Sequence, residues 1–135
     1  MMQNFQVLYT TYLSNIKNLP DNEDVVKILI TRFRPTTTFN PKKYNLIWRP
    51  SLAPSEYIFA RYKDGLMNWQ EFREEYIEQA STSSEFEKSF YEIKEYLDEG
   101  KDVFLICYEK DDLQCHRSIL REIFNCNDIK CREYK

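Results

Sequence analysis

The sequence predicts a three-layer, Rossmann-like α/β fold with a mostly parallel sheet and helices on both faces. Short β-prone apolar runs alternate along the chain with longer stretches that have helical spacing. Strands that are apolar almost throughout are typical of parallel sheets covered on both faces. The chain has 135 residues, the usual size of one domain, so we expect a single domain over residues 1–135.

Three segments are expected to form the main strands. Asp102–Tyr108 gives the strongest signal because it holds an unbroken apolar run, Val25–Ile30 is rich in β-branched residues, and Phe5–Tyr9 is shorter. Ile129–Arg132 is expected to add a short terminal strand. Strands that alternate with helices favour parallel pairing through right-handed crossovers.

Helical spacing fills most of the chain between these strands. The expected helices are Pro54–Gly65, a second after Asn68, a third from Ser83 or Ser84, and a fourth from His116 to Phe124. Asn68 precedes Glu71 at the spacing of a capping box, and Gly100 stands where a glycine commonly ends a helix. Residues 34–54 are rich in proline and show no period, so we expect a long loop there, and such loops are often functional.

Composition excludes several classes of protein. The net charge of −3 is opposite to that of proteins bound to nucleic acid by bulk charge. The chain has two glycines, Gly65 and Gly100, so it cannot form a glycine-rich phosphate loop. No segment approaches the ~18 apolar residues of a membrane span, and the first residues do not resemble a signal peptide. We therefore expect a cytoplasmic protein with no membrane partner.

Four cysteines lie near the C-terminus, at Cys107, Cys115, Cys126 and Cys131. In a reducing compartment they are expected to be thiols and not disulfides. Structural zinc sites usually present tight C-x₂-C pairs, which these spacings lack. The spacing therefore predicts no metal ion, and no motif predicts a cofactor.

Ligands of parallel sheets bind at the carboxyl ends of the strands, and polar residues follow each expected strand. These residues are Tyr9, Thr10 and Thr11 after the first strand, Arg32 and Arg34 after the second, and Cys107, Tyr108, Glu109 and Lys110 after the third. If the strands are parallel, the three sets meet at one edge. We therefore predict that they line a binding site.

Cys115, His116 and Arg117 stand at the expected start of the last helix. A helix start offers unpaired N–H donors and partial positive charge, and Arg117 can add a bidentate donor for a phosphate or carboxylate. We therefore expect Cys115 and Arg117 to contact an anionic group of a ligand. The alternative is that Arg117 pairs with Asp111 or Glu109.

Glu109, His116 and Cys107 are the candidate catalytic residues. Glu109 can act as a nucleophile or general base, and His116, the only histidine, has an ordinary pKa near neutrality. Cys107 or Cys115 can be a nucleophile if neighbouring positive charge favours the thiolate. Each also has a structural alternative: a solvated carboxylate, a packed or capping imidazole, and small buried thiols.

Basic and aromatic residues interleave around the long loop. They are Arg32, Arg34, Lys42, Lys43, Arg49 and Arg61, with Phe39, Tyr44 and Trp48 among them. Such a set can hold a stacked base and its phosphate. The alternative is a solvated loop with aromatic anchors.

The motifs together resemble the domain of unknown function 488 (DUF488) family. Cys107–Lys110 followed by Cys115–Arg117 carries the most specific part of the resemblance, and Val7–Tyr12, Leu52–Ser55, Tyr62–Gly65 and Trp69–Phe72 extend it over nearly the whole chain. The resemblance implies a compact α/β domain of bacterial or phage origin. It brings no assigned reaction.

Three functions are consistent with these observations. The first is an enzyme or enzyme-like domain that binds a phosphate-bearing ligand, a nucleotide or a nucleic-acid end, at the carboxyl ends of the strands. The second is a non-catalytic module that senses or sequesters a nucleotide. The third is a protein-interaction domain in which the Cys-His-Arg segment is structural.

Overall fold

The structure, a computed structural model, describes residues 7–33, 44–110 and 115–134. The strands are β1 (Leu8–Tyr12), β2 (Val25–Leu29), β3 (Leu46–Trp48), β4 (Asp102–Cys107) and β5 (Cys131–Glu133). The α-helices are α1 (Glu56–Lys63), α2 (Trp69–Thr82), α3 (Ser84–Asp98) and α4 (His116–Cys126). Leu13–Asn18 and Pro50–Leu52 form 3₁₀ helices.

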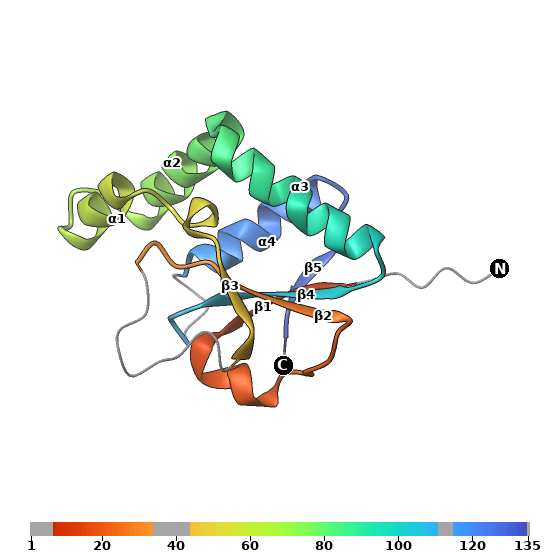
Figure 1. Cartoon of the computed structure of the whole chain (residues 1–135). Coiled ribbons are helices and arrows are strands. Elements are labelled where there is room, and N and C mark those ends of the chain that lie inside the picture. The colour runs from red at the N-terminus through yellow and green to blue at the C-terminus, as the bar shows by residue number, and fades with distance from the viewer. Residues whose placement is uncertain (1–6, 34–43, 111–114, 135) are drawn as a thin grey trace.

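The predicted α/β fold is confirmed. The strands of the described chain form one parallel sheet in the order β3-β2-β4-β1-β5. Figure 1 shows α1 to α4 on one face of this sheet and the 3₁₀ helix Leu13–Asn18 on the other, which gives three layers. Helices therefore flank both faces, although only one face carries α-helices among the described residues.

The α-helical face buries the larger core. Leu8, Ile28 and Leu105 point from neighbouring strands toward buried side chains of the helices, among them Phe72 and Leu120. Because successive strand residues point to opposite faces, Phe104 and Ile106 lie on the other side of β4. There they pack with a second cluster that includes residues of the 3₁₀ helix and the segment after it. Thus β4 is buried on both faces, which explains its unbroken apolar run.

Local signals set the helix ends as expected. Asn68 and Glu71 form a reciprocal capping box at the start of α2, and Ser83 caps α3 through the backbone N–H of Phe86. Gly100 has a φ of 89°, and the N–H groups of Gly100 and Lys101 bond to the carbonyls of Leu97 and Tyr96. This is the Schellman pattern, in which a glycine adopts the left-handed backbone that other residues avoid.

Three expectations about the strands are corrected. The first strand is Leu8–Tyr12 and not Phe5–Tyr9, so Tyr9, Thr10 and Thr11 lie within β1 and do not follow it. Residues 34–54 are not entirely loop, because they contain β3 and a 3₁₀ helix. The last strand is Cys131–Glu133, slightly later than expected, and pairs with β1 so that Glu133 lies opposite Thr10.

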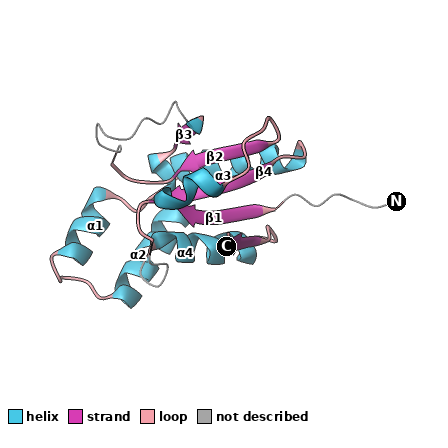
Figure 2. Ribbon diagram, turned by 90° about the horizontal axis from the view of Figure 1, so that it is seen from below, coloured by secondary structure: helices cyan, strands magenta, loops and turns pink. Residues whose placement is uncertain are grey.

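The carboxyl edge of the sheet is covered by two helices. Figure 2 shows α1 and α2 standing beyond the end toward which the strands point. The start of α4 lies at the same edge, since His116 contacts the carbonyl of Ile30, just after β2. The chain therefore brings the ends of β2 and β4 and the start of α4 together beneath α1 and α2.

Candidate functional site

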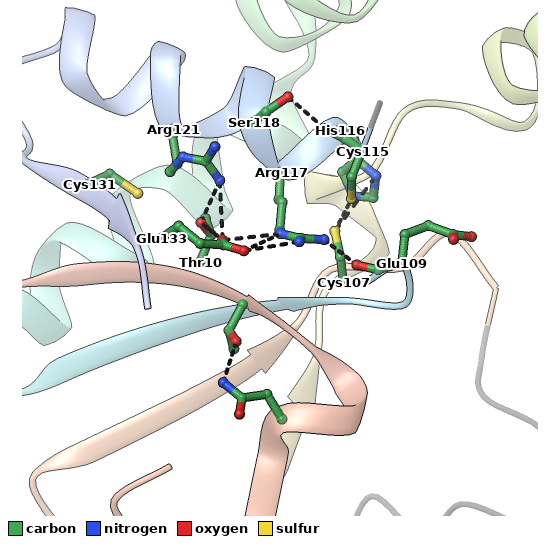
Figure 3. A network of polar contacts seen from close by, with 12 residues as sticks. Thr10, Cys107, Glu109, Cys115, His116, Arg117, Ser118, Arg121, Cys131 and Glu133 are labelled. Atoms are coloured by element: carbon green, nitrogen blue, oxygen red, sulfur yellow. Dashed lines mark hydrogen bonds and ion pairs between the residues drawn. The ribbon is translucent and has the colours of Figure 1, made fainter. Parts of the chain in front are cut away.

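Cys107, Cys115 and His116 form a compact buried cluster at this carboxyl edge. Their sulfur and ring nitrogen atoms all lie within 4.8 Å of one another. Cys107 ends β4, Cys115 is the N-cap of α4, and His116 is its first residue. The side chains meet because β4 ends beneath the start of the helix that follows it (Figure 3).

One hydrogen bond fixes the orientation of the His116 ring. Its Nε2 lies 2.8 Å from the carbonyl oxygen of Ile30, so Nε2 carries a proton and donates it. In the neutral ring Nδ1 is then an acceptor. Cys107 Sγ lies 3.4 Å from Nε2 and 3.8 Å from Nδ1. The imidazole therefore has one nitrogen bound to the Ile30 carbonyl, and its Nδ1 is an acceptor within reach of the Cys107 thiol.

Aromatic rings enclose the imidazole. Phe59 of α1 and Tyr76 of α2 meet it edge-on, with ring centroids 5.8 Å and 5.9 Å away. Burial, aided by the positive charges of Arg117 and Arg32, lowers the pKa of His116 to about 4. The ring is consequently neutral at neutral pH and can coordinate an ion through its lone pair. The lowered pKa makes it a weak base and leaves almost no imidazolium to act as a general acid.

The two thiols have different electrostatic environments. Burial and the neighbouring Cys115 raise the pKa of Cys107 well above its ordinary value. The pKa of Cys115 is lowered by a hydrogen bond from the Cys107 thiol and, against the effect of burial, by the backbone N–H and charge of Arg117. Cys115 is thus the more easily ionised sulfur. It occupies the helix start, where the sequence predicted a ligand anion.

Arg117 is fully buried and is held by the protein itself. Its guanidinium donates to both carboxylate oxygens of Glu133, at 3.0 to 3.2 Å. It also donates to the backbone carbonyls of Glu109 and Lys110, the second at 2.9 Å. A ligand anion would have to displace Glu133 to reach this guanidinium. The geometry therefore favours the alternative in which Arg117 pairs with an acidic side chain, and among the described residues that side chain is Glu133.

Glu133 joins this ion pair to a wider polar network. Its carboxylate accepts from Thr10 Oγ1 at 2.7 Å and from Arg121 at 3.2 Å, and Arg121 also donates to Thr10. Figure 3 shows the network running from β1 and β5 to the cluster. Thr10 therefore supports the site from below and does not face a ligand.

Arg32 belongs to the segment after β2, which forms one side of the cluster. Its Nε and Nη2 atoms donate to the carbonyls of Pro54 and Ala53, at 2.9 and 2.8 Å. Nη1 has no hydrogen-bond partner among the described residues. The side chain is partly exposed, and its charge acts on both His116 and Tyr76. Arg32 is thus a cation whose guanidinium is held along one edge, close enough to the cluster for its charge to act on His116.

The other predicted site residues are not brought to the cluster. Tyr9 stacks on Phe104 in the second core, on the opposite face of the sheet. The hydroxyl of Thr11 accepts from Asn15. The side chains of Tyr108, Glu109 and Lys110 are exposed, and Figure 3 shows the Glu109 carboxylate pointing away from the two sulfurs. Arg34 and the basic residues Lys42 and Lys43 lie outside the described residues.

Several residues of the site carried no signal in the sequence. Phe59 and Tyr76 are indistinguishable from other aromatic residues on helix faces. Glu133 is a single acidic residue near the C-terminus, 16 positions from Arg117. The carbonyl of Ile30 belongs to an apolar strand end. Only the paired strands and the packing of α1 and α2 place these groups around Cys107 and His116.

Comparison with protein families matches residues 11–128 to DUF488-N3a, described as the active DUF488-N3 subclade. The chain belongs to the DUF488 family. The resemblance identified from the sequence is therefore confirmed, and the match includes the whole Cys-His cluster. Searches of curated proteins and of solved structures return no match to this DUF488 member.

The DUF488 match supplies no ligand and no reaction, so the chemistry must be argued from the side chains. No helix among the described residues of this family member has both the length and the apolar character needed to cross a bilayer. The cluster offers two sulfurs and one ring nitrogen, which could act on a ligand directly or hold a metal ion.

Proposed function

We propose that this DUF488 domain is an enzyme that acts on a ligand with a phosphate-like anionic group. Arg32 holds the anion, and the Cys107–Cys115–His116 cluster is the reactive centre. The observation that carries the proposal is the edge of the Arg32 guanidinium that has no partner among the described residues, near the buried cluster at the carboxyl edge of the sheet. Binding sites of parallel α/β sheets lie at this edge.

Arg32 is prepared for an anion. The two carbonyls that hold it fix the plane of the guanidinium, which reduces the entropy lost when a ligand binds. The remaining N–H groups suit the paired oxygens of a phosphate or carboxylate. Among acidic side chains, Glu56 at the exposed start of α1 has the largest electrostatic effect on Arg32. Exposed carboxylates hold such cations weakly, so an anionic ligand can compete.

The ligand expected from the sequence, a nucleotide or a nucleic-acid end, is consistent with this site. Phe33 and Tyr108 follow the neighbouring strands β2 and β4, and both are large exposed aromatic residues. Exposed aromatic rings at a strand end can stack on a base. A non-catalytic module that sequesters a nucleotide would need the same anion contact but no turnover. A protein-interaction domain would need neither the anion contact nor turnover.

A thermal-shift assay tests the anion site. Inorganic phosphate and a nucleoside monophosphate are titrated against wild type, Arg32→Gln and a control, Arg61→Gln. Arg61 is also partly exposed but stacks on Tyr57 of α1. We expect wild type and Arg61→Gln to be stabilised, by about 2.7 kcal/mol at a hundredfold excess over the dissociation constant, and Arg32→Gln to respond little. An equal response of all three, or none in folded wild type, contradicts the site.

Product analysis then separates an enzyme from a binding module. The nucleotide that stabilises the wild type is incubated with wild type, Cys115→Ser and His116→Asn, and the mixture is separated by chromatography. Turnover by wild type alone, with binding retained in the variants, supports the enzyme. Binding by all three without any turnover favours the sequestering module.

A further inference from the structure

We propose that Cys107 Sγ, Cys115 Sγ and His116 Nδ1 bind one Zn²⁺-class metal ion and leave its fourth coordination position open. The inference rests on one premise of the proposed function, which is that this cluster is the reactive centre. The ion can bind whether or not Arg32 holds an anion. Thiolates and imidazole are the ligands that zinc prefers.

The distances are close to those of a tetrahedral site. Zinc bonds of 2.3 Å to sulfur and 2.0–2.1 Å to nitrogen place those two ligand atoms about 3.6 Å apart, and two sulfurs about 3.8 Å apart. Cys107 Sγ lies 3.8 Å from His116 Nδ1 and 3.4 Å from Nε2, and one ligand atom from each of the three residues falls within 4.8 Å of the others. Because the sulfur is nearer to Nε2, the imidazole or the thiol must rotate before the Nδ1 lone pair and both sulfurs point at one ion.

The hydrogen bond of His116 is the one that metal-binding histidines usually make. A histidine that coordinates through one nitrogen commonly donates the other N–H to a carbonyl or carboxylate, which fixes the ring and its tautomer. Here Nε2 donates to the carbonyl of Ile30 at 2.8 Å. Nδ1 consequently keeps a lone pair, and Cys107 Sγ lies 3.8 Å from this nitrogen.

The surroundings suit a buried ion with two thiolate ligands. Cys107, Cys115 and His116 are 0%, 3% and 7% exposed, and the rings of Phe59 and Tyr76 enclose the imidazole. Such surroundings limit the access of water and competing ligands. The buried guanidinium of Arg117 interacts with the charges of both sulfurs. A divalent ion balances the charge of two thiolates, while the Arg117 charge is balanced by Glu133.

The ligand count distinguishes this site from structural zinc sites. Structural zinc is held by four protein ligands, whereas catalytic zinc has three and keeps one position for water or substrate. The described residues supply three ligands here. An ion with an open position would supply Lewis-acid polarisation and would lower the pKa of a bound water molecule.

Cobalt titration tests the proposal directly. The reduced, metal-free full-length chain is titrated with Co²⁺, which reports thiolate coordination by sulfur-to-cobalt absorption in the near ultraviolet and four-coordinate geometry by visible bands. We expect both signals to saturate at one ion per chain and to disappear on adding Zn²⁺. Their absence in folded wild type overturns the proposal.

Variants identify the ligands. Cys107→Ser, Cys115→Ser and His116→Asn should each weaken cobalt binding at least tenfold, whereas Cys126→Ser, at an exposed cysteine outside the cluster, should match the wild type. Circular dichroism establishes that each variant is folded. If a cluster variant fails to fold, alkylation of wild type with and without Zn²⁺ replaces it. Burial already slows alkylation of Cys107 and Cys115, so bound Zn²⁺ should slow it further at these two thiols and leave Cys126 unchanged. The proposal is overturned if Zn²⁺ gives the cluster thiols no protection from alkylation, or if the cobalt signals are lost only in Cys126→Ser.

Arg32→Gln separates this inference from the proposed function. It should lose phosphate binding and keep the cobalt spectrum. A wild type that binds cobalt but no phosphate supports the metal site and contradicts the anion site. A wild type that binds phosphate but gives no cobalt–thiolate absorption overturns the metal site alone.

Discussion

Arg117 is the residue on which the geometry of the site depends most. It stands directly after His116, and its guanidinium ties α4 to β5 and to Glu109 and Lys110 in the segment after β4. Burying a guanidinium costs hydration energy, which is recovered only while its partners remain in place. The pair with Glu133 therefore adds little net stability, but it fixes where Cys115 and His116 lie relative to Cys107.

Glu133→Gln should consequently be costly. The change leaves the Arg117 charge buried without its carboxylate, so we expect the free energy of unfolding to fall by about 3 kcal/mol. Glu122→Gln is the control, since Glu122 pairs with Arg73 at the surface and should cost at most about 1 kcal/mol. Urea denaturation measures both. Adding Arg117→Met to Glu133→Gln should restore part of the loss, and equal losses in the two single variants would contradict this account.

Among the elements, α2 contributes most to the enclosure of the cluster. It carries Tyr76, whose hydroxyl donates to the carbonyl of Leu52 and whose ring contacts His116. The orientation of α2 is set at its start by the capping box of Asn68 and Glu71. The capping box at the start of α2 thus supports the contact of Tyr76 with His116, about two turns further along the helix.

Asn68→Ala should lower the free energy of unfolding by about 1 kcal/mol, because the backbone N–H of Glu71 loses its acceptor. Asn68→Gly should cost only a few tenths of a kcal/mol relative to wild type, since glycine is tolerated at an N-cap. Chemical denaturation of the three proteins gives the comparison. A glycine variant less stable than the alanine variant would show that the cap does not act as described.

At the scale of the whole molecule, stability should be graded from the centre of the sheet to its edges. β4 lies in the middle of the strand order, pairs with β1 and β2, and is buried on both faces. β3 and β5 are three residues long and stand at the edges. Edge strands open by local fluctuations, whereas a central strand opens only with the whole domain.

Native-state hydrogen exchange should therefore find the slowest amides in β4, with free energies of opening close to that of global unfolding. The amides of β3 and β5 should exchange by smaller openings. The experiment is informative for the site, because Cys107 is the last residue of β4. Faster exchange in β4 than in the edge strands would contradict the proposed order of stability.

The sequence by itself determined the fold class and the family, and it predicted the region of the candidate site. Apolar runs, capping residues and Gly100 are local signals, and each acts within a few residues of its position. The segment from Cys115 to Arg117 is also placed by a local signal, because the helical spacing of the residues that follow it predicts a helix that starts there. The exact span of β1 and the existence of β3 were missed, because short strands are selected by their neighbours in the sheet.

Only the tertiary structure decided which side chains meet. Whether Cys107 and Cys115 lie near each other depends on the path of the chain between β4 and α4, and spacing along the sequence does not record it. The partner of Arg117 is Glu133 because β5 pairs with β1, a contact between opposite ends of the chain. Contacts of this kind arise from the packing of whole elements, so no local pattern predicts them. The same packing brings Cys107, Cys115 and His116 together as a candidate metal site.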